Sequence, residues 1–154
     1  MKFFVAVIIL LFISCNGQKK AVTEDAKQSK LDDSLQLILS DAQGGLDEAE
    51  VLVIKDVKRL KSFYSKVNKT RKPGLPIPDI DFTKEMIVIQ CGGKKESSEL
   101  LPLLIAKETD SEVVLGTKIP RKSNTKSSEM QSNRFSVYKM PLTQKEVRFE
   151  EGIE

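Results

Sequence analysis

The chain has 154 residues with no histidine and two cysteines, and its 25 basic side chains stand against 22 acidic ones. The absence of histidine removes the commonest general base, the histidine-assisted serine and cysteine nucleophiles, and imidazole-based zinc sites. A formal net charge of +3 is too small to indicate nucleic-acid binding. The composition therefore excludes these classes of site, and because no catalytic motif stands out in the sequence, we expect no enzymatic activity, no cofactor and no metal.

The first residues of the chain have the order of an export signal. Lys2 precedes an unbroken apolar run, 3–13, which is about half as long as a membrane-spanning helix. Ser14 and Cys15 then resemble the bacterial lipobox, whose cysteine receives a diacylglyceryl group and becomes the acylated mature N-terminus. We predict a signal peptide over 1–14 and lipidation, with palmitate among the acyl chains, at Cys15. The alternative is a plain cleavage site beside a free thiol.

A lipid anchor would place the protein in the bacterial cell envelope. Asn16, rather than Asp, follows the cysteine, as in lipoproteins released to the outer membrane, so we expect that membrane. Residues 15–33 are rich in Lys, Gln, Ser and Asp and are predicted to form a flexible tether. The remaining residues, 34–154, suit a single domain with an adequate core.

Short apolar segments in this domain predict several strands and one helix. Asp56 is a good N-cap, and Val57, Leu60, Tyr64 and Val67 recur after it at helical spacing. The predicted strands are 35–39, 51–54, 86–89, 103–108, 112–115, 135–138 and 147–150. We therefore expect an α+β fold, in which a bent, mainly antiparallel sheet of about six strands packs on one principal helix.

Three segments of this domain carry a pattern of their own. They read GGLDEAEVLVIKDVKRL at 44–60, IPDIDFTKEMIVI at 77–89 and SNRFSVYKMPLTQKEVRFEE at 132–151. In order and spacing they resemble the C-terminal domain family of the protease-complex subunit PrcB. That family usually carries Gly-Gly-Tyr after the central strand, whereas Gly92-Gly93 is followed here by Lys94. The resemblance implies a noncatalytic accessory lipoprotein that associates with or stabilises an exported protein such as a protease.

Two basic stretches are candidate partner-binding surfaces. The first, 55–72, holds eight basic residues and one acid, and the second lies in a long polar segment, 118–132, predicted to be a loop. The candidate residues are Lys58, Arg59, Lys61, Arg71, Lys72, Arg121 and Lys122. They could bind an acidic partner or anionic lipid headgroups. The alternatives are a solvated helix face and a disordered loop.

Three acids and one cysteine are weaker candidates for chemistry. Asp79, Asp81 and Glu85 could hold calcium or serve acid–base chemistry, but the segment also fits a turn that needs no function. We favour the turn. Cys91 follows an apolar run and is predicted to be a buried, unreactive thiol.

The leading functional prediction is a membrane-tethered binding domain. The alternative is a small-ligand or glycan binder that uses the mouth of the bent sheet. That function needs exposed aromatic side chains beside polar groups, and the chain has no Trp and two tyrosines, Tyr64 and Tyr138. A deep pocket lined by Tyr138 would favour it.

Overall fold

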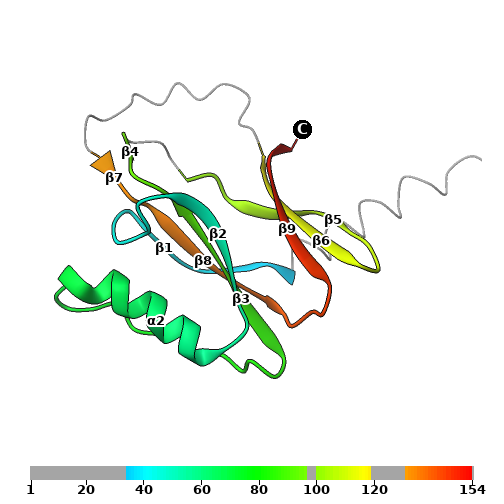
Figure 1. Cartoon of the computed structure of the whole chain (residues 1–154), viewed down its shortest axis with the longest axis horizontal. Coiled ribbons are helices and arrows are strands. Elements are labelled where there is room, and N and C mark those ends of the chain that lie inside the picture. Colours follow the sequence, from blue (N-terminus) through cyan, green and yellow to red (C-terminus); the bar gives the residue numbers. More distant parts are fainter. Residues whose placement is uncertain (1–33, 97–99, 119–130, 154) are drawn as a thin grey trace, which may run out of the picture. The chain divides into compact units, whose positions relative to one another are not determined.

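The structure, a computed structural model, describes residues 34–96, 100–118 and 131–153 (Figure 1). All of them belong to one compact unit, Leu31–Glu154. The predicted signal peptide, Cys15 and the tether lie outside the described residues, as do Arg121 and Lys122.

A four-stranded antiparallel sheet forms the middle layer of the fold. Its strands lie in the order β1-β8-β3-β2. They are β1 (Gln36–Asp41), β2 (Ala49–Ile54), β3 (Glu85–Gly92) and β8 (Phe135–Pro141). In β3 every side chain of residues 86–91 is buried, as expected for a strand that is covered on both faces.

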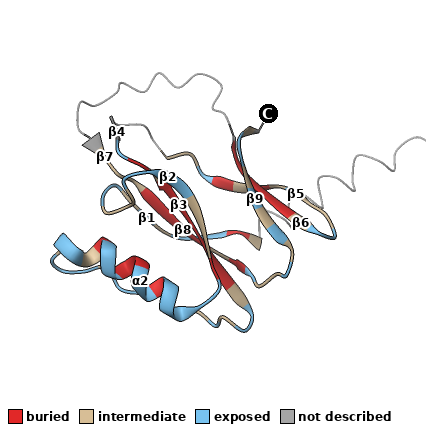
Figure 2. Ribbon diagram, viewed as in Figure 1, coloured by how far each residue is buried: buried red, intermediate tan, exposed pale blue. Residues whose placement is uncertain are grey.

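One face of this central sheet is covered by the helix α2 (Val57–Val67), which continues into the 3-10 turn η1 (Asn68–Thr70). The buried side of α2 packs against alternate residues of the two middle strands. The helix contributes Leu60, Phe63, Tyr64 and Val67, β3 contributes Ile87, Ile89 and Cys91, and β8 contributes Phe135 and Val137. Figure 2 shows the buried residues of α2 on the side that faces the sheet.

The other face of the central sheet is covered by a second sheet of three strands in the order β5-β6-β9. These strands are β5 (Leu103–Glu108), β6 (Glu112–Lys118) and β9 (Glu146–Ile153). β5 and β6 are antiparallel, whereas β6 and β9 are parallel. Between the sheets, Met86, Val88 and Tyr138 pack on residues of β5 and β6, and the Tyr138 hydroxyl accepts a hydrogen bond from Leu103 N at 3.0 Å.

The predicted α+β class is confirmed. Within the described residues, seven strands lie in two mainly antiparallel sheets beside one helix of 14 residues. The sequence pattern located each of these seven strands but did not anticipate their division into two sheets. It also missed the two-stranded pair β4 (Lys95–Glu96) and β7 (Gln131–Ser132), whose strands are too short and polar to give a periodic signal.

The two tyrosines give a matched test of this packing. Tyr138→Phe removes the acceptor of a buried backbone N–H, so we expect the free energy of unfolding to fall by about 1–2 kcal/mol. Tyr64→Phe removes a hydroxyl that is buried and has no hydrogen-bond partner among the described residues, so it should cost almost nothing. Urea denaturation of both variants checks this. Equal losses of unfolding free energy in the two variants would contradict a stabilising hydrogen bond between Leu103 N and the Tyr138 hydroxyl.

Candidate functional site

The helix α2 owes its position to an N-cap and to one apolar side. Asp56 has an extended backbone, and its Oδ1 accepts a hydrogen bond from Arg59 N at 2.8 Å, which satisfies one of the free N–H groups of the first turn. The four buried side chains of α2 recur at three- and four-residue steps, so they occupy one stripe of the helix. The opposite side of α2 therefore faces solvent.

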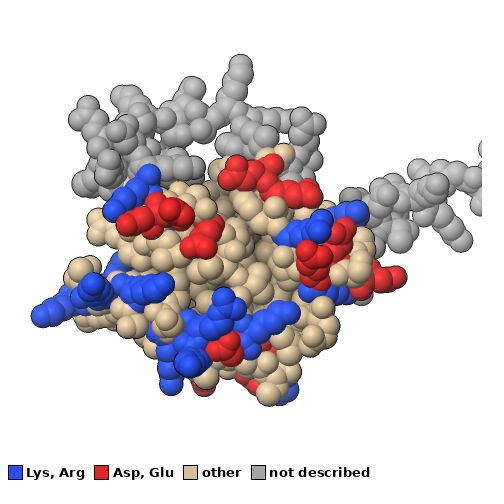
Figure 3. Space-filling view, viewed as in Figure 1, with Lys and Arg blue, Asp and Glu red and all other residues tan. Residues whose placement is uncertain are grey.

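The solvent side of α2 carries basic side chains and no acid. Lys58, Arg59, Lys61 and Lys66 are exposed on the helix, and Lys69 follows in η1. Within the described part of the chain, none of these five side chains forms an ion pair. Figure 3 shows the resulting concentration of Lys and Arg over α2. We call these five residues the basic surface.

Part of the basic surface opposes the dipole of its own helix. Lys58 and Arg59 stand in the first turn, which holds no acidic residue. The free N–H groups of a first turn carry partial positive charge, so a cation there is unfavourable by about 0.3–1 kcal/mol. Burial of each large apolar side chain on the other side contributes about 1.5–3 kcal/mol, and packing therefore outweighs the unfavourable charges. A residue choice that violates a local preference is expected where binding has selected the residue.

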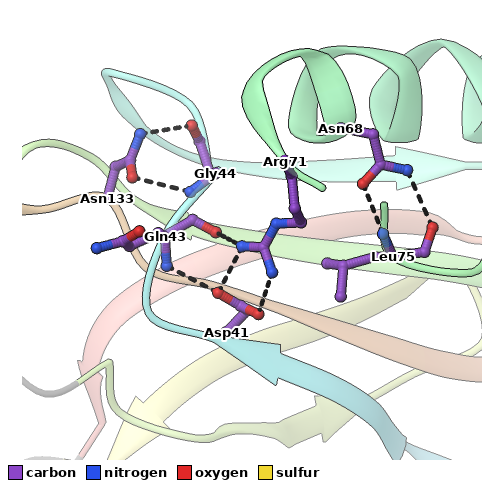
Figure 4. Close-up of polar contacts among 8 residues, drawn as sticks. Asp41, Gln43, Gly44, Asn68, Arg71, Leu75 and Asn133 are labelled. Atoms are coloured by element: carbon purple, nitrogen blue, oxygen red, sulfur yellow. Dashed lines mark hydrogen bonds and ion pairs between the residues drawn. The ribbon is translucent and has the colours of Figure 1, made fainter. Parts of the chain in front are cut away.

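Arg71, which the sequence pattern groups with the partner-binding residues, is paired with a carboxylate of the same chain. Its Nη1 and Nη2 donate to the two carboxylate oxygens of Asp41 at 2.9 and 2.8 Å, and Nη2 also donates to Gln43 O at 2.7 Å (Figure 4). These contacts fasten the chain after η1 to the end of β1. A guanidinium with both sides occupied has little capacity left for a partner.

The same contact lowers the pKa of the Asp41 carboxyl. The main cause is the hydrogen bonding from Arg71, which favours the ionised form, and burial opposes it only in part. Lys72, the next basic residue, is exposed and makes no ion pair with another described residue, so it can extend the basic surface.

Two asparagines hold the loops on either side of the Arg71–Asp41 pair (Figure 4). The Asn68 amide donates to Leu75 O at 2.9 Å and accepts from Leu75 N at 2.8 Å. The Asn133 amide likewise donates to Gly45 O and accepts from Gly44 N. Each side-chain amide thus satisfies one backbone N–H and one backbone carbonyl of a loop. The sequence pattern does not single out these two residues, because an Asn in a polar segment fits many turns equally well.

Gly44 and Gly45 permit this close packing of loops. Gly44 has φ +96°, a backbone conformation that favours glycine. A Cβ on Gly45 would lie 2.7 Å from Asn133 O, too close for any other residue. The loop after β1 therefore depends on both glycines.

Of the three acids, Asp81 serves the turn before β3. Asp81 accepts from Thr83 N at 3.0 Å and from Thr83 Oγ1 at 2.5 Å, and Lys84 Nζ lies 3.1 Å from its second oxygen. The hydrogen bond from the Thr83 side chain is the main cause that lowers the pKa of Asp81. Glu85 pairs with Lys139 at 2.8 Å. Among the described residues, no group of three or more acids and cysteines could hold a metal ion.

Cys91 is buried, as the sequence predicts. Its side chain is 3% exposed and lies in the core between α2 and the central sheet. Burial disfavours the thiolate and raises the pKa of the Cys91 thiol, which lowers its reactivity.

Comparisons of the chain with protein-family models, with characterised proteins and with solved structures find no match. The resemblance to the PrcB C-terminal domain therefore rests on the three sequence segments and stays a prediction. No helix in the described part of the chain is long and apolar enough to span a bilayer.

Removal of the Arg71 guanidinium should cost stability in a pH-dependent way. Arg71→Gln should lower the free energy of unfolding by about 1–2 kcal/mol at neutral pH, since the pair is only about one-quarter exposed. The folded-state pKa of Asp41 lies below its ordinary value of 3.8, so this stabilisation is complete above that pH and disappears as the pH falls through the lower value.

Urea denaturation between neutral pH and the lowest pH at which both proteins fold checks this prediction. Lys72→Gln, which removes the adjacent but unpaired charge, is the control and should change stability by less than about 0.5 kcal/mol. A cost for Arg71→Gln that does not depend on pH would contradict the assigned role of Asp41.

Proposed function

We propose that this chain is a noncatalytic, lipid-anchored binding domain of the bacterial cell envelope, and that its basic surface docks on an acidic face of an exported protein. The basic surface is the observation that carries the proposal. Its five cations have no acidic partner in the described part of the chain, and they stand on a helix whose other side is fixed in the core. Such a patch steers a complementary acidic partner and selects it over others.

An exposed apolar side chain lies beside the basic surface and favours a protein over a lipid surface as the partner. Val57 is 52% exposed, although it is a large apolar residue in a helix. It lies one turn before Lys61, so the two side chains share a side of α2. An apolar side chain with charged residues around it is typical of protein–protein interfaces, which have an apolar centre and a polar rim.

The accessory role follows from the resemblance to the PrcB C-terminal domain. In the family that the chain resembles, a strand leads into a helix, and an Asp-Phe turn then leads into a buried strand. The chain has the same order: β2 leads into α2, and the turn at Asp81 and Phe82 leads into the buried strand β3. The lack of histidine and the internal partners of Asp81 and Glu85 also support a noncatalytic role. The proposed partner is accordingly an exported protein such as a protease.

The alternative based on Tyr138 has less support. This side chain is 4% exposed, and its hydroxyl accepts the hydrogen bond from Leu103 N between the two sheets. Tyr138 is thus part of the core and does not stand at the mouth of a sheet, where a glycan could stack on it.

Neutralising the basic surface should abolish binding of the partner. We expect the triple variant Lys58→Gln, Arg59→Gln, Lys61→Gln to lose the exported protein that crosslinks to the wild-type chain in cells. The matched control removes three other exposed bases, Lys84, Lys107 and Arg148, whose side chains are 80%, 65% and 60% exposed. Crosslinking followed by mass spectrometry checks this. If the first triple variant still crosslinks to the same protein as the wild type, the basic surface is not the binding site.

Charge reversal at the start of the helix should separate stability from binding. The double variant Lys58→Glu, Arg59→Glu places acids where the helix dipole favours them, so we expect stability to rise by about 0.5–1.5 kcal/mol. The same variant should lose the crosslinked partner. Urea denaturation and crosslinking of this variant check both outcomes, and a more stable protein that still binds would contradict a functional role for the two cations.

The lipid anchor is tested at the cysteine. Wild-type chain should incorporate labelled fatty acid in bacterial cells, and Cys15→Ala should not, because it lacks the sulfur that carries the diacylglyceryl group. Autoradiography of the purified proteins checks this. Continued labelling of the variant would contradict the anchor without affecting the proposed role of the basic surface.

A further inference from the structure

The two larger sheets of the described residues have four edge strands, β1 and β2 in the central sheet and β5 and β9 in the second sheet (Figure 1). An edge strand presents unpaired backbone N–H and C=O groups along one side, and a further strand can pair with them. Proteins protect such edges with bulges, charged side chains or very short strands. The protection of each edge therefore decides which of them can accept another strand.

Three of these four edge strands carry an extra residue that interrupts their pairing. In β1, Ile38 has no opposite residue on β8, and in β5, Ala106 has none on β6. In β9 the register shifts between Glu150 and Ile153. A bulge bends its strand and breaks the regular spacing of the outward N–H and C=O groups. These three edges therefore resist pairing with another strand.

Among the four described edges, β2 alone has no interruption. Its six residues pair one-to-one with the consecutive residues 87–92 of β3. Residues 51–54 are Val, Leu, Val and Ile, with no charge, proline or glycine. Beyond its ladder with β3, the backbone of β2 makes no hydrogen bond to another described residue. β2 therefore offers a regular outward row of donors and acceptors to a further strand.

A second copy of β2 fits this row without opposing like charges. When a strand pairs antiparallel with its own copy, the two-fold axis runs normal to the sheet, so residues of the same face lie opposite each other. With Val51 on this axis, Glu50 lies opposite Leu52 of the copy. Just beyond the two ends of β2, Lys55 lies opposite Asp47 of the copy, which is a favourable pair of charges.

The neighbouring registers are less favourable. An axis through Leu52 would place Glu48 opposite Asp56 of the copy, and an axis through Val53 would place Glu50 opposite Asp56. Like charges directly opposite each other destabilise a strand pair. The charges of β2 and its flanking residues thus select the register with Val51 on the axis.

We infer that two copies of this chain pair antiparallel through β2, so that their two central sheets become one continuous sheet. Each copy supplies the other with the same uninterrupted row of backbone groups over the same length. Because the axis is normal to the sheet, both α2 helices lie on the same side of the joined sheet. The pair therefore presents two basic surfaces in one direction, and a partner held at two points binds with raised avidity.

Photocrosslinking of the full chain in cells tests this pairing, with the photoreactive amino acid placed at Glu50 and with two differently tagged copies produced together. An adduct that carries both tags is expected from position 50, because this side chain lies opposite Leu52 of the copy. Glu150 on the bulged strand β9 is also exposed and acidic, so it is the matched control position and should give no such adduct.

Three results of this experiment would overturn the inference. They are the absence of a two-tag adduct from position 50, an adduct there with a different protein in place of the copy, and equal two-tag adducts from positions 50 and 150. The second result would mean that an extended segment of another protein occupies the edge of β2.

Charged variants at Val51 test the position of the axis. This side chain is partly buried and borders an open pocket, so a longer side chain has room to reach solvent. Val51→Lys and Val51→Glu each place a charge opposite a like charge and should each reduce the two-tag adduct about tenfold, whereas Val51→Thr should retain it. When the Lys and Glu variants are produced together, opposite charges meet and the adduct should return.

Loss of the adduct in both charged variants without recovery on joint production would overturn this register. Urea denaturation of each variant first verifies that it folds, and if one does not, the comparison of positions 50 and 150 in the otherwise wild-type chain decides. The test is independent of the proposed function. The triple variant at Lys58, Arg59 and Lys61 should keep the two-tag adduct, and the Val51 variants should keep a crosslink from α2 to the exported protein.

Discussion

The burial of β3 on both faces is the constraint on which the rest of this structure depends. Residues 86–91 of this strand alternate between two cores, one shared with α2 and one shared with the second sheet. Burial of each large apolar side chain contributes about 1.5–3 kcal/mol, so leaving either face of β3 open would remove a large part of the stability. The helix and the second sheet are therefore held on opposite sides of one strand, and each presents a separate outer surface.

This separation explains how the helix can carry a basic outer surface. The helix is anchored through Leu60, Phe63, Tyr64 and Val67, and its outer side is free to accumulate cations. The Arg71–Asp41 pair and the hydrogen bonds between Asn68 and Leu75 hold the C-terminal end of the helix in place, so the basic side chains project from a fixed backbone.

Local sequence patterns predicted most elements because each one depends on near neighbours. Asp56 and the spacing from Val57 to Val67 located the helix, and runs of β-branched residues located the strands. The sequence pattern did not predict the parallel pairing of β6 and β9, because the pairing of segments distant in the chain produces no pattern in the local sequence. The same reason hid the Arg71–Asp41 pair, which spans 30 residues.

The central claim is that α2 meets an exported protein through its outer side. Site-specific photocrosslinking in cells tests it most directly, with the photoreactive amino acid placed at Lys61 on α2 or at Lys107 on β5. The account predicts an adduct with one exported protein from position 61 and none from position 107. An adduct with lipid alone from position 61, or a protein adduct from position 107 alone, would contradict it.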